Sequence, residues 1–311
     1  MNPIIEIQNL SKSFVDIHAV KELRLEIQSG EMFGIVGPDG AGKTTTFRML
    51  CGIIPPTSGT ATILGCDLLK ETKKIRTQIG YLSQRFSLYG DLTIDENIEF
   101  FAEIHEVSNY KERREELLEF TRLTPFRTRL AEHLSGGMKQ KLALVCTLIH
   151  QPKIIFLDEP TTGVDPVSRR DFWRILSSLL KQNITIVMST PYLDEAERCN
   201  RVAMMHEGNI MVVDTTQNIR GMMKGEVLEI VCDDFQHAPD ILKELSFVHG
   251  VQTFGDRLNV IVDDSRKQFD ELQQRMHENN ITITDWRTIS PSLENVFISL
   301  LSQHRVVKER E

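Results

Sequence analysis

The sequence predicts an α/β fold, in which a mainly parallel sheet carries helices on its faces, followed by a smaller α+β unit. Two observations support this prediction. Short apolar runs alternate with helix-like segments up to about residue 220, and strands that alternate with helices favour a parallel sheet. Beyond Gly221 the order of the expected elements changes, and 311 residues are enough for two domains.

The first unit is expected to span residues 1–220. Most of its strands are identified as short apolar runs, and residues 23–27 by alternation of apolar and polar side chains. The expected strands are 4–10, 23–27, 32–36, 78–82, 153–157 and 184–188. One helix is expected to begin within 43–50. Much of 92–130 is expected to be helical, and a further helix is expected over 166–181.

The second unit is expected to span residues 221–311. Its expected strands are 226–232, 250–254, 257–263 and 281–287, and its expected helices are 237–246, 265–279 and 291–302. The first six of these elements follow the order βαββαβ, which is that of a small ferredoxin-like domain.

Composition excludes several classes of protein. With 36 basic and 44 acidic residues the net charge is −8, which argues against a nucleic-acid partner. No apolar run approaches the ~20 residues that cross a bilayer, and the N-terminus lacks the features of a secretory signal. The five cysteines are widely separated and form no C-x-x-C pair, so free thiols in a reducing cytosol are expected. We therefore expect a soluble, cytoplasmic chain.

A glycine-rich loop follows the expected strand 32–36 and fits the pattern G-x-x-x-x-G-K-[ST]. It consists of Gly37, Pro38, Asp39, Gly40, Ala41, Gly42, Lys43 and Thr44, with Thr45 next in the chain. Such a loop wraps backbone N–H groups around nucleotide phosphates. Lys43 is then expected to reach the β- and γ-phosphates, and the Thr44 hydroxyl to bind Mg²⁺.

Two carboxylates end the apolar strand 153–157, at the edge where open α/β sheets place their ligands. Asp158 is the expected Mg²⁺ ligand of a P-loop ATPase. Glu159 is then the expected general base that polarises the attacking water.

The segment 134–140, Leu-Ser-Gly-Gly-Met-Lys-Gln, resembles the LSGGQ-type signature of the ATP-binding-cassette (ABC) family. The alternative is a helix N-cap with a flexible turn. The resemblance implies that Ser135, Gly136 and Gly137 form an anion site for the γ-phosphate of ATP held by another subunit. Two chains would then complete each ATP pocket.

The resemblance covers residues 4 to about 215 and implies a mixed sheet with a helical subdomain at about 85–145. It assigns Gln84 to sensing Mg²⁺ and the attacking water, and Asp165 to a loop at the dimer interface, where a plain turn is the alternative. Phe14 lies where the family places an aromatic ring on adenine, although ordinary core packing is equally compatible.

Two positions depart from the family pattern. Asp39 replaces the commoner asparagine and adds negative charge near the triphosphate. Pro191 occupies the position of the switch histidine, and proline has neither a side-chain donor nor a backbone N–H. We expect hydrolysis to survive at a reduced rate through Glu159. The alternative is a regulatory half that mainly binds ATP while its partner hydrolyses it.

Residues 291–297, Pro-Ser-Leu-Glu-Asn-Val-Phe, resemble the ending of bacterial exporter cassettes of the drug-resistance type. This implies an ATPase subunit that powers efflux of drugs or other small molecules. Its implied partners are a second cassette, identical or paralogous, and integral membrane permease subunits that dock on residues 85–135 and hold it at the inner face of the cell membrane. A soluble ABC ATPase of translation or DNA repair is a further alternative, but the chain lacks a long coiled-coil insert and a second cassette.

Overall fold

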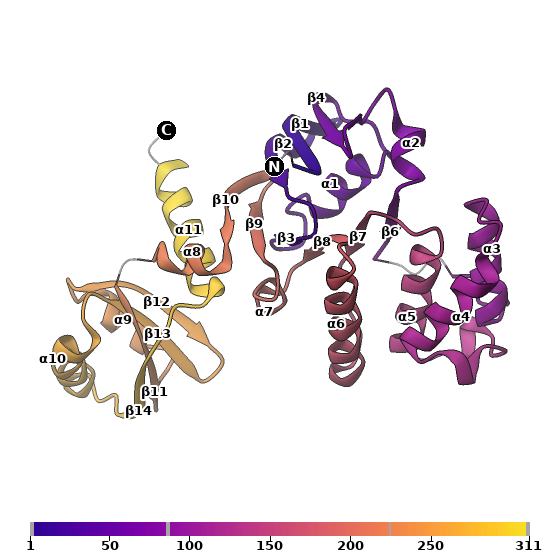
Figure 1. Ribbon diagram of the computed structural model, residues 1–311. Coiled ribbons are helices and arrows are strands. Elements are labelled where there is room, and N and C mark those ends of the chain that lie inside the picture. The colour runs from indigo at the N-terminus through magenta and orange to yellow at the C-terminus, as the bar shows by residue number, and fades with distance from the viewer. Residues whose placement is uncertain (1–2, 85–87, 224, 309–311) are drawn as a thin grey trace. The chain divides into compact units, whose positions relative to one another are not determined.

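The computed structural model describes residues 3–84, 88–223 and 225–308, with side chains up to residue 301 (Figure 1). The chain divides into two compact units, Met1–Asp214 and Thr215–Glu311. The division falls before the expected boundary at 220, because α8 (Thr216–Gly221) contacts α11 (Leu293–Lys308) of the second unit.

The first unit contains a six-stranded sheet in the order β10-β9-β3-β8-β7-β6. Its strands are β3 (Met32–Val36), β6 (Ile79–Leu82), β7 (Ile154–Asp158), β8 (Thr185–Thr190), β9 (Arg201–His206) and β10 (Asn209–Thr215). Strand β3 runs parallel to β8 and β9, and β7 runs parallel to β6 and β8. The carboxyl ends of β3, β7 and β8 therefore meet at one edge of the sheet, where the site lies.

A second sheet of the first unit is antiparallel where its pairings are defined, in the order β2-β1-β4-β5. Its strands are β1 (Ile5–Phe14), β2 (Ile17–Ile27), β4 (Ser58–Ile63) and β5 (Cys66–Asp67). One buried apolar cluster joins both sheets to α1 (Lys43–Leu50), and in it Phe47 packs edge-on against Phe156 with ring centroids 5.5 Å apart. This shared core fixes the helix that follows the glycine-rich loop.

Helices α3, α4 and α5 contact one another and lie together in Figure 1. The helices of the first unit after α1 are α2 (Thr72–Arg76), α3 (Ile94–Ile104), α4 (Tyr110–Thr121), α5 (Gly136–Leu148), α6 (Pro166–Lys181) and α7 (Leu193–Ala196), with short 3-10 turns at Thr124–Phe126 and Ala131–His133. The group α3–α5 falls where a helical subdomain is expected, although residues 85–87 of that range lie outside the described residues.

The second unit has a four-stranded antiparallel sheet in the order β12-β13-β11-β14. After α8 its elements are β11 (Glu226–Cys232), α9 (Ala238–Lys243), β12 (Val248–Phe254), β13 (Arg257–Val262), α10 (Ser265–Glu278), β14 (Ile283–Ile289) and α11. The strands and the helices α9 and α10 follow the expected order βαββαβ, and a buried apolar cluster joins them. Within the described ranges of both units, no helix is both long enough and apolar enough to span a bilayer.

Candidate nucleotide-binding site

The glycine-rich loop connects β3 to α1, as the sequence predicts. Gly40 and Gly42 have φ angles of +79° and +106°, in the left-handed region that favours glycine. A Cβ atom on Gly37 would lie 2.0 Å from the carbonyl oxygen of Met205. The loop therefore depends on glycine for its path, and its backbone is open to a phosphate chain.

Lys43 is almost fully buried, with 4% of its surface exposed. Its ammonium group donates to the carbonyl oxygens of Gly37 at 2.8 Å and Pro38 at 3.0 Å. It also lies 3.2 Å from Oε1 of Glu159, and Gln84 Nε2 donates to the other carboxylate oxygen at 2.9 Å. The structure thus brings the predicted phosphate-binding lysine, general base and sensing glutamine into one contact chain.

Asp158 is fully buried and surrounded by hydroxyl groups. Thr44 Oγ1 donates to its Oδ1 at 3.1 Å, Ser189 Oγ to the same oxygen at 2.6 Å, and Tyr81 OH to Oδ2 at 3.2 Å. Burial and the charge of Asp158 raise the pKa of Tyr81, which keeps its hydroxyl protonated.

The hydroxyl of Thr44 and the carboxylate of Asp158 form a pair of hard oxygen donors of the kind Mg²⁺ prefers, so these residues fit the predicted cation. Gln84, which is expected to sense Mg²⁺ and the attacking water, donates to the carboxylate of Glu159.

A pocket of about 650 Å³ opens beside the loop. It is lined by Phe14, Ile17, His18, Ala19, Lys21, Asp39, Gly40, Ala41, Gly42, Lys43, Thr44, Thr45, Gln84, Glu159 and Glu207. Phe14 is 45% exposed, with the Lys12 ammonium 5.1 Å from its ring centre, so it is not a core residue. Sequence interpretation missed His18 and Lys21, which contribute from the neighbouring strand β2.

The signature segment opens helix α5. Ser135 is the N-cap residue and its hydroxyl accepts from the backbone N–H of Met138 at 3.3 Å. Ser135 and Gly136 are exposed, and neither is among the described residues that line the pocket. A Cβ atom on buried Gly137 would lie 2.2 Å from the hydroxyl of Ser168, so this glycine permits close packing of α5 on α6.

Asp165 caps the N-terminus of α6, where its carboxylate accepts from the backbone N–H groups of Ser168 and Val167 at 3.0 and 3.1 Å. Hydrogen bonds from Ser168 are the main cause that lowers the pKa of Asp165. The residue is exposed and therefore accessible to a partner.

Pro191 follows the last residue of β8. Thr190 contacts the segments near Pro191 through two hydrogen bonds. Its carbonyl oxygen accepts from the backbone N–H of Gly37 at 3.3 Å, and its hydroxyl accepts from the backbone N–H of Tyr192 at 3.0 Å. The loop at the switch position is thus ordered by its neighbours rather than by the proline.

Sequence interpretation assigned no role to Tyr81 or Ser189, which donate to Asp158 together with Thr44. The signal for both is their place near the carboxyl ends of strands β6 and β8, which flank β7. In the parallel register Asp158 lies opposite Ser189. Polar residues at the ends of neighbouring parallel strands are expected to meet.

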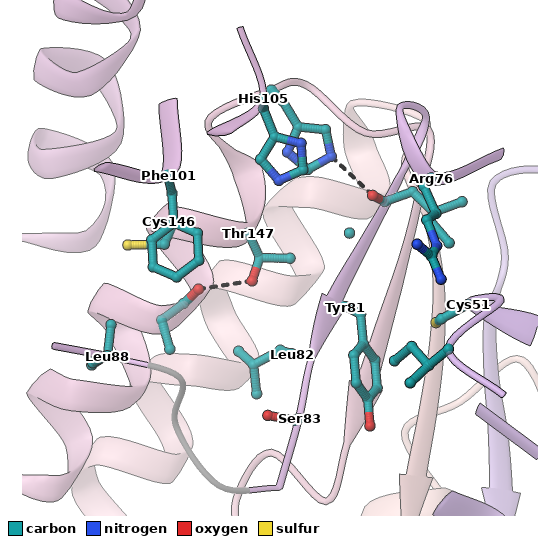
Figure 2. A pocket seen from close by; sticks show the side chains of 15 residues that line it. Cys51, Arg76, Tyr81, Leu82, Ser83, Leu88, Phe101, His105, Cys146 and Thr147 are labelled. Atoms are coloured by element: carbon teal, nitrogen blue, oxygen red, sulfur yellow. Dashed lines mark hydrogen bonds between the residues drawn. The ribbon is translucent and has the colours of Figure 1, made fainter. Parts of the chain in front are cut away.

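A second hollow, of about 250 Å³, lies between β6, α3 and α5 (Figure 2). Its walls include Leu82, Phe101 and Cys146. The imidazole of His105 stacks on that of His150 at 3.9 Å, and His150 Nε2 lies 2.9 Å from the carbonyl oxygen of Ile79. Burial, and then the neighbouring His105, lower the pKa of His150 to about 4.

Together, the strand–loop–helix, the buried lysine and the hydroxyl–carboxylate pair define a P-loop nucleotide-binding protein. A model of the ABC transporter family matches residues 20–162. The daunorubicin/doxorubicin resistance ATP-binding protein DrrA of Streptomyces peucetius is 32% identical over 303 residues, which cover 95% of this chain and 92% of that protein. The chain belongs to the ABC transporter family and is an ABC-type ATPase cassette.

Two further similarities support this assignment. The probable multidrug ABC transporter ATP-binding protein YbhF of Escherichia coli K12 is 40% identical over 219 residues, or 70% of this chain, and the match spans only 38% of that protein. The dimeric structure of the ATP-binding cassette MJ0796, in a post-hydrolysis state bound to ADP and Pi, is 27% identical with a TM-score of 0.63. That match covers 68% of this chain and 98% of MJ0796.

Proposed function

We propose that the chain is the ATP-hydrolysing subunit of a membrane exporter for drugs or other small molecules. The observation that carries the hydrolytic part is the contact chain Lys43–Glu159–Gln84 in the lining of the P-loop pocket. Export is supported by the names of the relatives, one a multidrug transporter protein and one a drug-resistance protein. The match to the latter also includes the second unit.

Each residue of the pocket has a chemical task in this proposal. Lys43 binds the β- and γ-phosphates. Thr44 and Asp158 would hold Mg²⁺, which would supply positive charge beside the phosphoryl oxygens. Glu159 accepts a proton from the attacking water, and Gln84, hydrogen-bonded to it, orients that water.

Phe14, exposed in the same pocket, is proposed to stack on adenine. Its test is Phe14→Ala, which is expected to weaken ATP binding by about tenfold. Ile17→Ala is the matched control, because Ile17 is an exposed apolar residue that lines the same pocket without an aromatic ring. Equal losses of affinity in the two variants would argue against stacking.

The ATP pocket is proposed to be completed by a second cassette. Ser135 and Gly136 are exposed at the N-terminus of α5, where a serine hydroxyl and helix N–H groups suit a phosphate of a nucleotide bound to the partner. Asp165 is exposed at the neighbouring helix and is the proposed interface residue. The dimeric state of MJ0796 supports the same arrangement here.

Permease subunits are proposed to dock on the helical part of the first unit and to hold the chain at the cytoplasmic face of the membrane. The second hollow, beside α3, offers an apolar surface, and Ile104 and Tyr89 next to it are 58% and 46% exposed. No nucleic-acid partner is proposed, because the net charge is −8.

Pro191 favours a second candidate, in which the chain is a regulatory half with weak hydrolysis. Steady-state ATP hydrolysis by the purified chain separates the two. Turnover that disappears in Glu159→Gln supports an active ATPase. No turnover in the parent chain, with activity gained in Pro191→His, would favour the regulatory half.

A further inference from the structure

Glu195 is a buried carboxylate that the proposed hydrolytic machinery does not use. It lies in α7, directly after the loop that contains Pro191, and only 1% of its surface is exposed. A charge in such a place is costly unless it is paired or hydrogen-bonded. Its partners therefore indicate why the residue is there.

Both oxygens of the Glu195 carboxylate accept hydrogen bonds from threonine hydroxyls. Thr161 Oγ1 donates to Oε1, and Thr190 Oγ1 donates to Oε2 at 2.8 Å. Arg169 Nε lies 3.7 Å from Oε1 and supplies the opposite charge. The two threonines are themselves buried and come from different segments, one after β7 and one at the end of β8.

Each threonine lies next to the nucleotide site, Thr161 along the chain and Thr190 through a hydrogen bond. Thr161 follows Glu159 by two residues, in a turn where Thr162 N donates to the carbonyl oxygen of Glu159 at 3.3 Å. Thr190 accepts from Gly37 N, the first N–H of the phosphate loop. The Glu195 carboxylate thus joins the segment of the general base to the strand that supports the phosphate loop.

The neighbouring residue Ser189 strengthens this connection. Its hydroxyl and its carbonyl oxygen accept from the backbone N–H of Glu159 at 3.0 and 3.1 Å, and the same hydroxyl donates to Asp158. The end of β8 is therefore hydrogen-bonded both to the carboxylate of Asp158 and to the backbone of Glu159. Pro191, which follows, has no hydrogen-bond donor to add to these contacts.

We infer that Glu195 is a positioning residue for ATP hydrolysis, which clamps Thr161 to Thr190 and so holds Glu159 in place against the attacking water. This inference rests on the proposed ATPase function. A group that acts only through the placement of Glu159 affects the chemical step more than nucleotide binding, because ATP is bound by the phosphate loop.

The test measures kcat, KM and the Kd for ATP in the full-length chain. Glu195→Ala removes both acceptors, and kcat is expected to fall by about a hundredfold, with much smaller changes in KM and in the Kd for ATP. Glu195→Gln keeps one acceptor oxygen, and its amide can donate to the second threonine hydroxyl, so we expect a smaller loss of about tenfold. Partial rescue by the conservative variant distinguishes positioning from a general need for a buried side chain.

Thr161→Val and Thr190→Val provide a second measurement that does not depend on the folding of the Glu195 variants. Each is expected to lower kcat by about tenfold, and each is expected to add little in the Glu195→Ala background, because the interaction is already absent there. Additive losses would contradict a shared clamp.

Glu31→Gln is the matched control. Glu31 is another largely buried carboxylate, 3.1 Å from Arg201, and it precedes β3 at the end opposite the phosphate loop. It is expected to lower the melting temperature like Glu195→Gln but to leave kcat unchanged.

The outcomes separate this inference from the function on which it rests. An unchanged kcat in the Glu195 variants, or parallel losses of kcat and ATP affinity, would overturn the positioning role while parental turnover keeps the ATPase function. A parent chain without turnover would overturn both.

Discussion

Replacing Glu159 by glutamine removes one negative charge beside Lys43 and leaves the side-chain shape unchanged, so it can separate ATP binding from hydrolysis. The carboxylate lies 3.2 Å from the ammonium, and the two side chains are 7% and 3% exposed. At this distance the attraction between unit charges is about 5 kcal/mol with an effective dielectric constant of about 20, which is an upper bound. A bound triphosphate has to compete with Glu159 for Lys43.

If only a quarter of that attraction opposes the phosphates, the variant binds ATP about tenfold more tightly, which corresponds to ~1.4 kcal/mol. Without nucleotide the variant is less stable, because the ion pair is lost. A loss of about 2 kcal/mol lowers the melting temperature of a unit of this size by about 4–8 °C. Turnover is expected to fall by at least about a hundredfold, because an amide cannot accept the proton of the attacking water.

The assay is thermal melting with and without Mg-ATP, combined with phosphate release. Glu159→Gln is expected to melt below the parent without nucleotide. At saturating concentrations, ATP is expected to stabilise the variant by about 1.4 kcal/mol more than it stabilises the parent. Glu31→Gln provides the comparison for loss of an ion pair remote from the pocket. An unchanged melting temperature without ATP, together with an unchanged ATP-induced stabilisation, would refute the competition between Glu159 and the phosphates.

Three further predictions concern other parts of the first unit. Pro191→His should raise kcat by about tenfold, since it adds a donor at the switch position; equal turnover in the parent and the variant would mean that this position does not limit the reaction. The pKa of His150 is lowered to about 4, below about 6.5 in the unfolded chain, so its contribution to stability is complete above about pH 6.5 and is lost as the pH falls toward 4. Urea unfolding should therefore show that the free energy of unfolding falls between pH 7 and pH 5 by about 1 kcal/mol more in the parent than in His150→Gln, after an allowance for solvent screening. Equal decreases in the two proteins would contradict the burial of a neutral imidazole. Gly137→Ala should destabilise the chain by about 2 kcal/mol, because its Cβ would lie 2.2 Å from the Ser168 hydroxyl. Addition of Ser168→Gly should restore part of the loss in the same melting experiment, and no recovery would point to a different clash.

Local signals explain which elements could be predicted from the sequence. Helix α6 has the expected bounds, because Asp165 caps it and Pro166 occupies its first position. Strand β4 was not predicted, since only Ala61 and Ile63 of its side chains are buried, and its register is set by pairing with β1. Its existence depends on a partner far away in the sequence, which a local pattern does not contain.

In the site, too, local sequence patterns could be recognised, whereas contacts between distant segments could not. The phosphate loop is contiguous, so its residues could be named from the sequence. The hydrogen bond between Gln84 and Glu159 joins positions 75 residues apart, and the bond between Thr161 and Glu195 joins positions 34 apart. Such contacts follow from the order of parallel strands, and strand order is not encoded in the spacing of any single motif.

The separation of the P-loop pocket from the exposed Ser135–Gly136 segment has a genetic consequence for a symmetric pair of these chains. A Lys43→Ala chain and a Gly136→Asp chain would each be inactive alone, because every ATP site would contain one damaged half. In a mixed pair, both lesions fall on the same site and the other site is built from two intact halves. Random mixing in equal amounts would then restore about a quarter of the parental sites, since half of the pairs are mixed. Recessive alleles of one gene could therefore complement each other.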